Sequence, residues 1–224
     1  MTQVDKTPEK ISEMFNEISK SYDKNNNIIS FGLHKKIKKS AIGLLDFSDN
    51  IKILDLCCGT GDVTEILANT KYTLDICGID FSKDMISVAK KRFPNLKFKC
   101  GDATTMPDYK NSSVDIITMA FGLRNINDRQ AAIKESYRVL KNGGQFLHLD
   151  FGYKNIFSVI FNLIAITAIK LLYGNTLPYK YLIQSKKEFP EPEELIKEFE
   201  REGFKLKKKK DFLFGVISAQ VYKR

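Results

Sequence analysis

Five short apolar runs alternate with segments of helical pattern between residues 51 and 151, and this alternation restricts the fold more than any other feature of the sequence. The runs are predicted strands, namely Ile51–Leu56, Leu74–Ile79, Leu96–Cys100, Val114–Ala120 and Gln145–Phe151. The segments between them, 62–69, 83–92 and 128–140, are predicted helices. Such alternation is typical of a parallel sheet with helices on both faces. The runs are apolar almost throughout, as expected for strands that are buried on both sides.

The rest of the chain continues this pattern without a linker, so the 224 residues are predicted to form a single domain. An apolar helix at 156–172 is followed by a helix that starts near Phe189-Pro190 and ends at Gly203. Two last strands, about 204–210 and 212–222, are expected to join through Asp211. The domain then divides into a basic helical start, a central half, an apolar helical segment and a C-terminal part, at 1–50, 51–151, 152–192 and 193–224.

Net charge and cysteine content restrict the expected partners and the cellular compartment of the protein. Lys and Arg number 36 against 27 Asp and Glu, a net charge of +9, which favours an anionic partner such as a nucleic acid or a phospholipid surface. The four cysteines form no C-x-x-C pair and have no histidine at ligand spacing, so neither a metal site nor a disulfide framework is predicted. The first residues carry no apolar signal segment, and we expect a reducing, cytoplasmic location.

One apolar run raises the question of whether part of the chain contacts a membrane. Residues 156–169 are interrupted only by Ser158, Asn162 and Thr167. A membrane-spanning helix needs about 20 such residues, so this helix is predicted to be buried or interfacial. It either fills the core or lines a hydrophobic channel and touches the bilayer.

A glycine turn follows the first predicted strand. Asp55 lies in that strand and is followed by Gly59, Thr60 and Gly61, which allow the backbone to approach a ligand closely. A dinucleotide fingerprint would require a third glycine where Thr64 stands, and no Gly-Lys-Ser/Thr of a P-loop is present. Taken alone, the turn could equally be a plain connection between strand and helix.

Acidic residues also close the second and third predicted strands. Asp80 is placed to accept both hydroxyls of a ribose, and Asp102 with Ala103 is placed to meet an adenine amino group. Each aspartate could instead cap a helix. Because three such features end three successive strands, a nucleoside ligand is the favoured interpretation.

This combination resembles the class I S-adenosylmethionine-dependent methyltransferases. The resemblance covers about residues 51–151 and includes Gly143-Gly144 before the fifth strand. It implies a Rossmann-like α/β fold with a seven-stranded, mostly parallel sheet whose last strand is antiparallel. It also implies S-adenosylmethionine as the cofactor, with Ala120 at the end of the fourth strand joining the residues that hold it.

A narrower resemblance, to the ubiquinone/menaquinone biosynthesis C-methyltransferases, runs nearly from end to end. The segments that carry it are Ser21-Tyr22-Asp23, residues 30–35, Cys57-Cys58-Gly59-Thr60-Gly61-Asp62, Phe121-Gly122-Leu123-Arg124-Asn125, Tyr181-Leu182, Ser185, Phe189-Pro190, Gly203-Phe204 and Gly215-Val216. The resemblance implies methylation of a ring carbon in a polyprenylated quinol, either a benzoquinol or a naphthoquinol.

Four residues are predicted to carry the chemistry that this reaction needs. Arg124 stays protonated and would stabilise the developing phenolate, and Asn125 could hold the same oxygen or a water. His34 has a pKa range suited to proton transfer, and Tyr22 could extend the hydrogen-bond network. Alternatively, Arg124-Asn125 could be a helix cap with a surface ion pair, His34 a structural histidine and Tyr22 a packing residue. We interpret His148 as structural and leave Asp150 open.

The expected partners are a polyprenylated quinol and the anionic inner face of a membrane, with a homodimer allowed and no nucleic acid. The enzymatic alternatives are methylation of nucleic acid, which the charge would suit, or of another small molecule. Methylases of exocyclic base amines commonly carry Asn/Asp-Pro-Pro-Tyr/Phe after the fourth strand, where this chain has Ala120-Phe121-Gly122-Leu123. A third alternative is a membrane-associated scaffold without catalysis, against which the intact glycines and strand-end acids argue.

Overall fold

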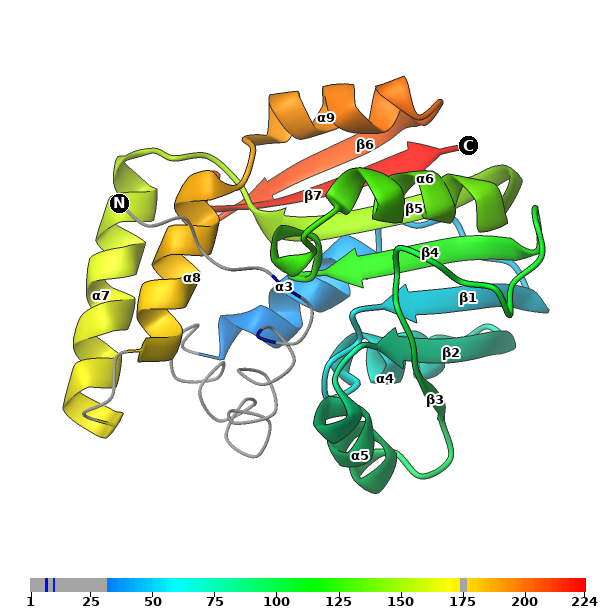
Figure 1. The fold of residues 1–224 in the computed structure, drawn as a ribbon, viewed down its shortest axis with the longest axis horizontal. Helices are drawn as coiled ribbons and strands as arrows, with labels where there is room; N and C mark the ends of the chain where they lie inside the picture. Colours follow the sequence, from blue (N-terminus) through cyan, green and yellow to red (C-terminus); the bar gives the residue numbers. More distant parts are fainter. Residues whose placement is uncertain (1–6, 8–9, 11–31, 174–176) are drawn as a thin grey trace.

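Seven strands form one sheet in a computed structural model of the chain, which describes residues 7, 10, 32–173 and 177–224 (Figure 1). The strand order is β3-β2-β1-β4-β5-β7-β6. The strands are β1 (Ile51–Leu56), β2 (Leu74–Asp80), β3 (Lys97–Cys100), β4 (Val114–Ala120), β5 (Leu140–Phe151), β6 (Lys205–Phe212) and β7 (Ile217–Lys223).

Strand direction follows the predicted scheme. The pairs β1–β2, β1–β4, β2–β3 and β4–β5 are parallel, and β7 is antiparallel to both β5 and β6. The predicted fold class, a mostly parallel seven-stranded sheet with an antiparallel last strand, is therefore confirmed. Strands β2 and β3 lie on one side of β1, and β4 and β5 lie on the other, so the strand order changes direction between β1 and β4. Open α/β sheets bind ligands at the carboxyl ends of the strands next to such a point.

Helices cover both faces of the sheet, because neighbouring residues in the strands point to opposite sides. One core packs Leu54 and Ile117 against α6 and α9, and the other packs Ile53 and Ile116 against α3 and α4. The helical elements are α3 (Leu33–Ile42), α4 (Asp62–Ala68), α5 (Lys83–Arg92), η1 (Leu123–Asn125), α6 (Arg129–Val139), α7 (Ile156–Tyr173), α8 (Leu177–Glu188) and α9 (Pro192–Arg201).

Two boundaries differ from the sequence prediction by more than two residues, and one helix was not predicted separately. Strand β5 begins at Leu140 rather than Gln145, since Leu140 already pairs with Val114 and Gly143 bonds to the C-terminal residue. The turn between the last two strands is residues 213–216, and Asp211 lies inside β6. Helix α8 was not predicted as a separate helix, although residues 152–192 were expected to be helical, because its apolar pattern is weak.

Helices α7 and α8 stand side by side beyond the carboxyl ends of the parallel strands (Figure 1). The start of α7 is fixed by Asn155, whose Oδ1 accepts a hydrogen bond from the Ser158 amide at 3.0 Å. In the part of the chain that the structure describes, no helix combines the length and the apolarity needed to cross a membrane. The helix pair thus stands at the edge of the sheet where the predicted site residues gather.

Candidate active site

The glycine turn after β1 is joined to the end of β2. The backbone amide of Gly59 donates to Asp80 Oδ2 at 2.8 Å, and the Ser82 amide donates to Asp80 Oδ1 at 2.9 Å. Burial raises the pKa of Asp80, although these two hydrogen bonds oppose the shift. Gly61 adopts φ +90°, and a Cβ there would lie 2.8 Å from the Phe98 ring, so only glycine fits.

Asp55 stabilises the glycine turn through hydrogen bonds from two hydroxyl groups. Its two carboxylate oxygens accept hydrogen bonds from Thr64 Oγ1 at 2.6 Å and Thr118 Oγ1 at 2.8 Å. Burial raises the pKa of Asp55 to about 6, and the two hydroxyls partly offset that shift. Asp55 therefore ties β1, β4 and α4 together directly behind the glycines.

The helix-cap alternative for the two strand-end acids is wrong. Ser82 is the N-cap of α5, with its Oγ accepting from the Met85 amide at 3.1 Å. Asp102 precedes no helix; its Oδ1 accepts from both the amide and the hydroxyl of Thr104, which orders the loop after β3. Ala103 is buried beside it.

Arg124 forms a buried ion pair with Asp150 at the end of β5. Its Nη1 lies 2.9 Å from Asp150 Oδ1 and 2.6 Å from the Phe121 carbonyl oxygen. The arginine side chain is 7% exposed and that of Asp150 is 0% exposed, so the alternative of a surface ion pair is wrong. Within the described residues, Arg124 Nε and Asp150 Oδ2 are buried without a hydrogen-bond partner. Buried polar atoms are nearly always hydrogen-bonded, so two unpartnered atoms in one ion pair mark this pair as a candidate functional group.

Asn125 links this site to α8. Its Nδ2 donates to the Phe121 carbonyl at 3.3 Å, and its Oδ1 accepts from the Tyr181 hydroxyl at 3.1 Å. Further along α8, Lys186 Nζ lies 4.7 Å from the centre of the Phe151 ring, and the Arg124 guanidinium lies 5.1 Å from the same ring. Burial, followed by repulsion from Arg124, lowers the pKa of Lys186 to about 8.

His34 enters the site from α3 and meets an acid from the glycine turn. Its Nε2 lies 3.6 Å from Asp62 Oδ2, and the same oxygen accepts from Lys38 Nζ at 3.0 Å. On the other side, Asp62 Oδ1 accepts from Arg92 Nη2 at 2.9 Å. Burial would raise the pKa of Asp62, but the bonds from His34, Lys38 and Arg92 outweigh it and hold this pKa well below its usual range.

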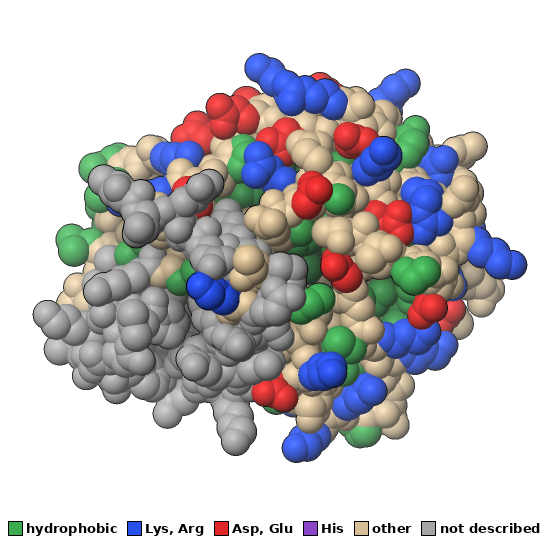
Figure 2. All heavy atoms as spheres, viewed as in Figure 1, with side chains coloured by type: hydrophobic (Ala, Val, Ile, Leu, Met, Phe, Trp, Pro, Cys, Tyr) green, Lys and Arg blue, Asp and Glu red, His purple; other side chains and the backbone are tan. Residues whose placement is uncertain are grey.

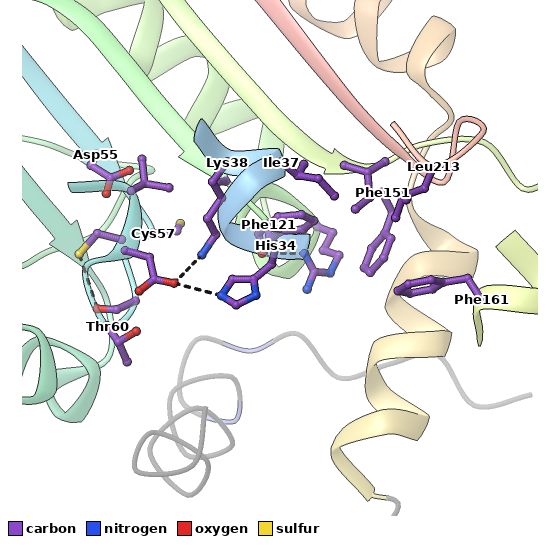
Figure 3. Close-up of a pocket in the computed structure, with 17 residues that line it drawn as sticks. His34, Ile37, Lys38, Asp55, Cys57, Thr60, Phe121, Phe151, Phe161 and Leu213 are labelled. Carbon is purple, nitrogen blue, oxygen red and sulfur yellow. Dashed lines mark hydrogen bonds and ion pairs between the residues drawn. The ribbon is translucent and has the colours of Figure 1, made fainter. Parts of the chain in front are cut away.

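These elements enclose one cavity with two unlike ends (Figure 3). The end at the glycine turn is lined by Asp55, Gly59 and Thr60, and the opposite end is apolar and aromatic. His34 lies between the two ends (Figure 3), and Arg124 belongs to the same lining. The apolar end is formed by Phe121, Phe151, Phe161, Leu213 and Ile217. A polar ligand and an apolar ring could therefore meet beside Arg124 and His34.

The structure brings together most of the predicted site residues. Six of them line the cavity, namely His34, Asp55, Gly59, Thr60, Ala120 and Arg124. The others described, Gly61, Asp80, Asp102, Ala103 and Asn125, lie outside this lining but in the same strand-end turns. Tyr22 lies outside the described residues.

Sequence reasoning missed four residues of the site. Asp150 was left open, and Asp62, Tyr181 and Lys186 were given no role. For Asp62 a signal exists, because His34 and Lys38 are four residues apart on one helix face and need an acid opposite. Tyr181 stands in the Tyr181-Leu182 segment that carries the family resemblance, although no role was given to it. Lys186 had no signal. In the described part of the chain, no group of His, Cys, Asp and Glu is placed to hold a metal.

Comparison with known proteins agrees with this geometry. The model of the ubiE/COQ5 methyltransferase family matches residues 1–223. The chain belongs to this family. It is 36% identical to the demethylmenaquinone methyltransferase of Leptospira interrogans, over 96% of this chain and 92% of that protein. It is 37% identical to the ubiquinone/menaquinone biosynthesis C-methyltransferase UbiE of Campylobacter jejuni, over 96% of this chain and 98% of that protein.

Solved structures show the same fold at low sequence identity. An S-adenosylmethionine-dependent methyltransferase from Thermotoga maritima superposes with a TM-score of 0.67 at 18% identity, over 94% of this chain and 98% of that one. One from Aquifex aeolicus gives 0.61 at 13% identity, over 83% and 88% of the two chains. The predicted family and methyltransferase class are confirmed by the family match, and the names of these neighbours agree with the predicted cofactor.

Proposed function

We propose that this member of the ubiE/COQ5 family transfers a methyl group from S-adenosylmethionine to a ring carbon of a polyprenylated quinol, in menaquinone or ubiquinone biosynthesis. The relatives that carry those names match this chain over more than nine-tenths of its length. The observation on which the proposal rests is the cavity itself, whose lining combines Arg124 with a glycine turn and an aromatic end.

The residues at the polar end fit the cofactor. Gly59 and Gly61 leave the backbone open to close approach, Asp80 is held against the turn by the Gly59 amide, and Asp102 stands in an ordered loop. We assign the ribose hydroxyls to Asp80, the adenine to Asp102 and Ala103, and the methionine part to the turn behind which Asp55 lies. When bound there, S-adenosylmethionine supplies an electrophilic methyl group.

Arg124 is the residue that we assign to the developing negative charge. A ring carbon becomes nucleophilic as the neighbouring hydroxyl loses its proton, and the oxygen then needs a donor. The Arg124 guanidinium remains protonated and keeps a free Nε within the described residues, while Asp150 and the Phe121 carbonyl hold its other end. Asn125 is held by Tyr181 and could orient the same oxygen or a water.

His34 is the proposed proton acceptor, and Tyr22 is proposed to extend its network. Asp62 orients the His34 ring from the side of the glycine turn, as a carboxylate beside a catalytic histidine does. Neutral imidazole can take the proton directly or through a water. The role of Asp62 is to position this ring, since its own charge is committed to Lys38 and Arg92.

Nucleic acid is a poorer substrate for this geometry. On the face in Figure 2 the Lys and Arg side chains are spread out and do not gather into one stripe. The cavity is lined by Phe121, Phe151 and Phe161, which suit an apolar ring and tail. We therefore also propose peripheral contact with an anionic membrane at the cytoplasmic side, whereas a homodimer stays a prediction.

The reaction is tested by transfer of labelled methyl from S-adenosylmethionine to demethylmenaquinol and to the demethylated benzoquinol, with RNA as the competing acceptor.

Arg124→Lys keeps a charge against Asp150 but loses Nε, and we expect turnover to fall about 100-fold or more with cofactor affinity near wild type. Asp80→Asn should do the reverse and weaken cofactor binding in calorimetry. Methylation of RNA alone, or equal loss of cofactor binding in both variants, contradicts the proposal.

A further inference from the structure

The apolar end of the cavity is closed by two elements that are distant in sequence. Phe161 comes from α7, and Leu213 comes from the turn between β6 and β7. Both side chains are partly buried and pack against the same hydrophobic core. Figure 3 shows them on the side of the cavity away from Asp55 and Thr60.

A second, outer pair continues this wall to the surface. Phe157 precedes Phe161 by one helical turn and so lies on the same face of α7, and Phe214 follows Leu213 directly. The rings of Phe157 and Phe214 stack, with centroids 4.6 Å apart and planes at 21°. They are nevertheless 43% and 78% exposed. An inner pair on the cavity and an outer pair at the surface therefore lie between α7 and the turn.

The turn carries these apolar side chains at a conformational cost. Leu213 has φ +51° and Phe214 has φ +54°, a left-handed conformation that costs a bulky residue about 1–2 kcal/mol. Asn-Gly would make a hairpin turn of this kind without strain. Backbone strain that persists at an exposed aromatic residue points to a function for that residue.

Hydrogen bonds tie the turn to the start of α7. Asn155, which caps α7, also donates from Nδ2 to the Phe214 carbonyl oxygen at 2.8 Å. The Tyr153 amide donates to the Gly215 carbonyl oxygen at 2.8 Å. These hydrogen bonds fix the turn against the start of α7. The rings of Phe157 and Phe214 are joined only by their stacking contact.

We propose that the polyprenyl tail of the substrate leaves the cavity between Phe161 and Leu213 and runs outward past Phe157 and Phe214. The inference rests on the proposed function and deepens it. A quinol ring beside Arg124 places its apolar substituent toward the aromatic end, and a long tail must then reach the surface. On the same helix as Phe157, the side chains of Ile160, Leu163 and Ile164 are exposed, so α7 offers the tail a further apolar surface outside the cavity.

The test compares a long-tailed demethylmenaquinol with the same ring bearing no tail. Leu213→Trp narrows the exit between Phe161 and residue 213. We expect kcat/KM for the tailed substrate to fall about tenfold or more, because several methylene groups of the tail can no longer be buried there. The tailless substrate should lose much less, so the ratio of the two kcat/KM values, and not the rate on either substrate alone, is the readout. Leu96→Trp, an equivalent change before β3 at the opposite edge of the sheet, should affect neither substrate.

A second measurement needs no turnover. A tail carrying a photoreactive diazirine in its first isoprene units should label peptides that contain Phe161 and residues 213–214. Labelling elsewhere, or equal effects of Leu213→Trp on both substrates in a folded protein, would overturn the exit route. If wild type methylates neither substrate and takes up no label, the proposed function itself fails, which is a different outcome.

Discussion

At the residue scale, the site depends on a close contact between the backbone of Gly122 and the side chain of Cys57, which leaves no room for a side chain on Gly122. A Cβ on Gly122 would lie 2.4 Å from Cys57 Cβ. Cys57 and Phe121 themselves adopt φ +55° and +59°, at the ends of the adjacent strands β1 and β4. Left-handed residues of this kind cluster at ligand sites, where the surrounding structure holds them in place.

This contact gives a prediction about Gly122. Its own φ of −103° suits any residue, so Gly122→Ala should destabilise only through the clash, by about 2 kcal/mol. Cys57→Gly removes the opposing Cβ and the left-handed strain, and the double variant should recover most of the loss. Urea unfolding of the four proteins measures this coupling. Strictly additive losses would mean that the two residues do not oppose each other.

At the element scale, one carboxylate fastens α3 to the glycine turn. Asp62 reaches His34 and Lys38 on α3 and Arg92 on α5, and it begins α4. Hydrogen bonds hold its pKa below the ordinary value of an unfolded chain, so its stabilisation is present above about pH 4 and is lost as the pH falls further. The position of His34 in the site thus depends on the ionised form of Asp62.

The prediction is that Asp62→Asn lowers the free energy of unfolding by about 3 kcal/mol at pH 7 and by clearly less at pH 2, because the stabilisation decreases gradually as the pH falls below the ordinary carboxylate pKa. Urea unfolding at the two pH values checks this. Asp75→Asn, which breaks the exposed pair with Lys97, serves as the matched control and should change little at either pH. A loss of the same size at both pH values would show that packing, and not charge, is what Asp62 contributes.

At the scale of the whole molecule, the net charge and the exposed apolar surface both favour contact with an anionic membrane. The chain has a net charge of +9, and α7 exposes a row of large apolar side chains with no acid in its first turn. Leu163 is 65% exposed. Green side chains are visible at the edge where α7 lies (Figure 2). The described part of α7 therefore does not fill the core, which was the alternative that its sequence left open.

We expect the protein to float with vesicles that contain phosphatidylglycerol and to be released as salt is raised, since each basic residue near the surface contributes about 1 kcal/mol. Leu163→Asp together with Ile160→Asp should abolish flotation, because burying each apolar side chain is worth roughly 1.5–3 kcal/mol. Asn95→Asp, at the opposite edge of the sheet, adds the same type of charge and should keep flotation. Equal binding by all three proteins would contradict membrane contact through α7.

The sequence by itself determined the strand and helix alternation, the sheet class and the gathering of the glycine turn and strand-end acids at one edge of the sheet. These follow from local patterns: continuous apolar runs make buried strands, and a glycine turn and strand-end acids must meet at one edge of a parallel sheet. Asp55, Gly59, Asp80 and Asp102 were predicted in this way, and the structure places them at that edge. Local signals were also enough for Gly203, which ends α9 at φ +97°.

Only the tertiary structure decided which distant side chains meet at the substrate end. Arg124 with Asp150, Asn125 with Tyr181, and Phe161 with Leu213 come from elements whose relative position follows from packing over the whole sheet. Helix α8 carries no strong pattern of its own, and hydrogen bonds from Tyr181 to Asn125 and from Lys186 to Asn162 hold it where it lies. Pairings between residues far apart in the chain depend on three-dimensional packing, and no spacing in the sequence records them.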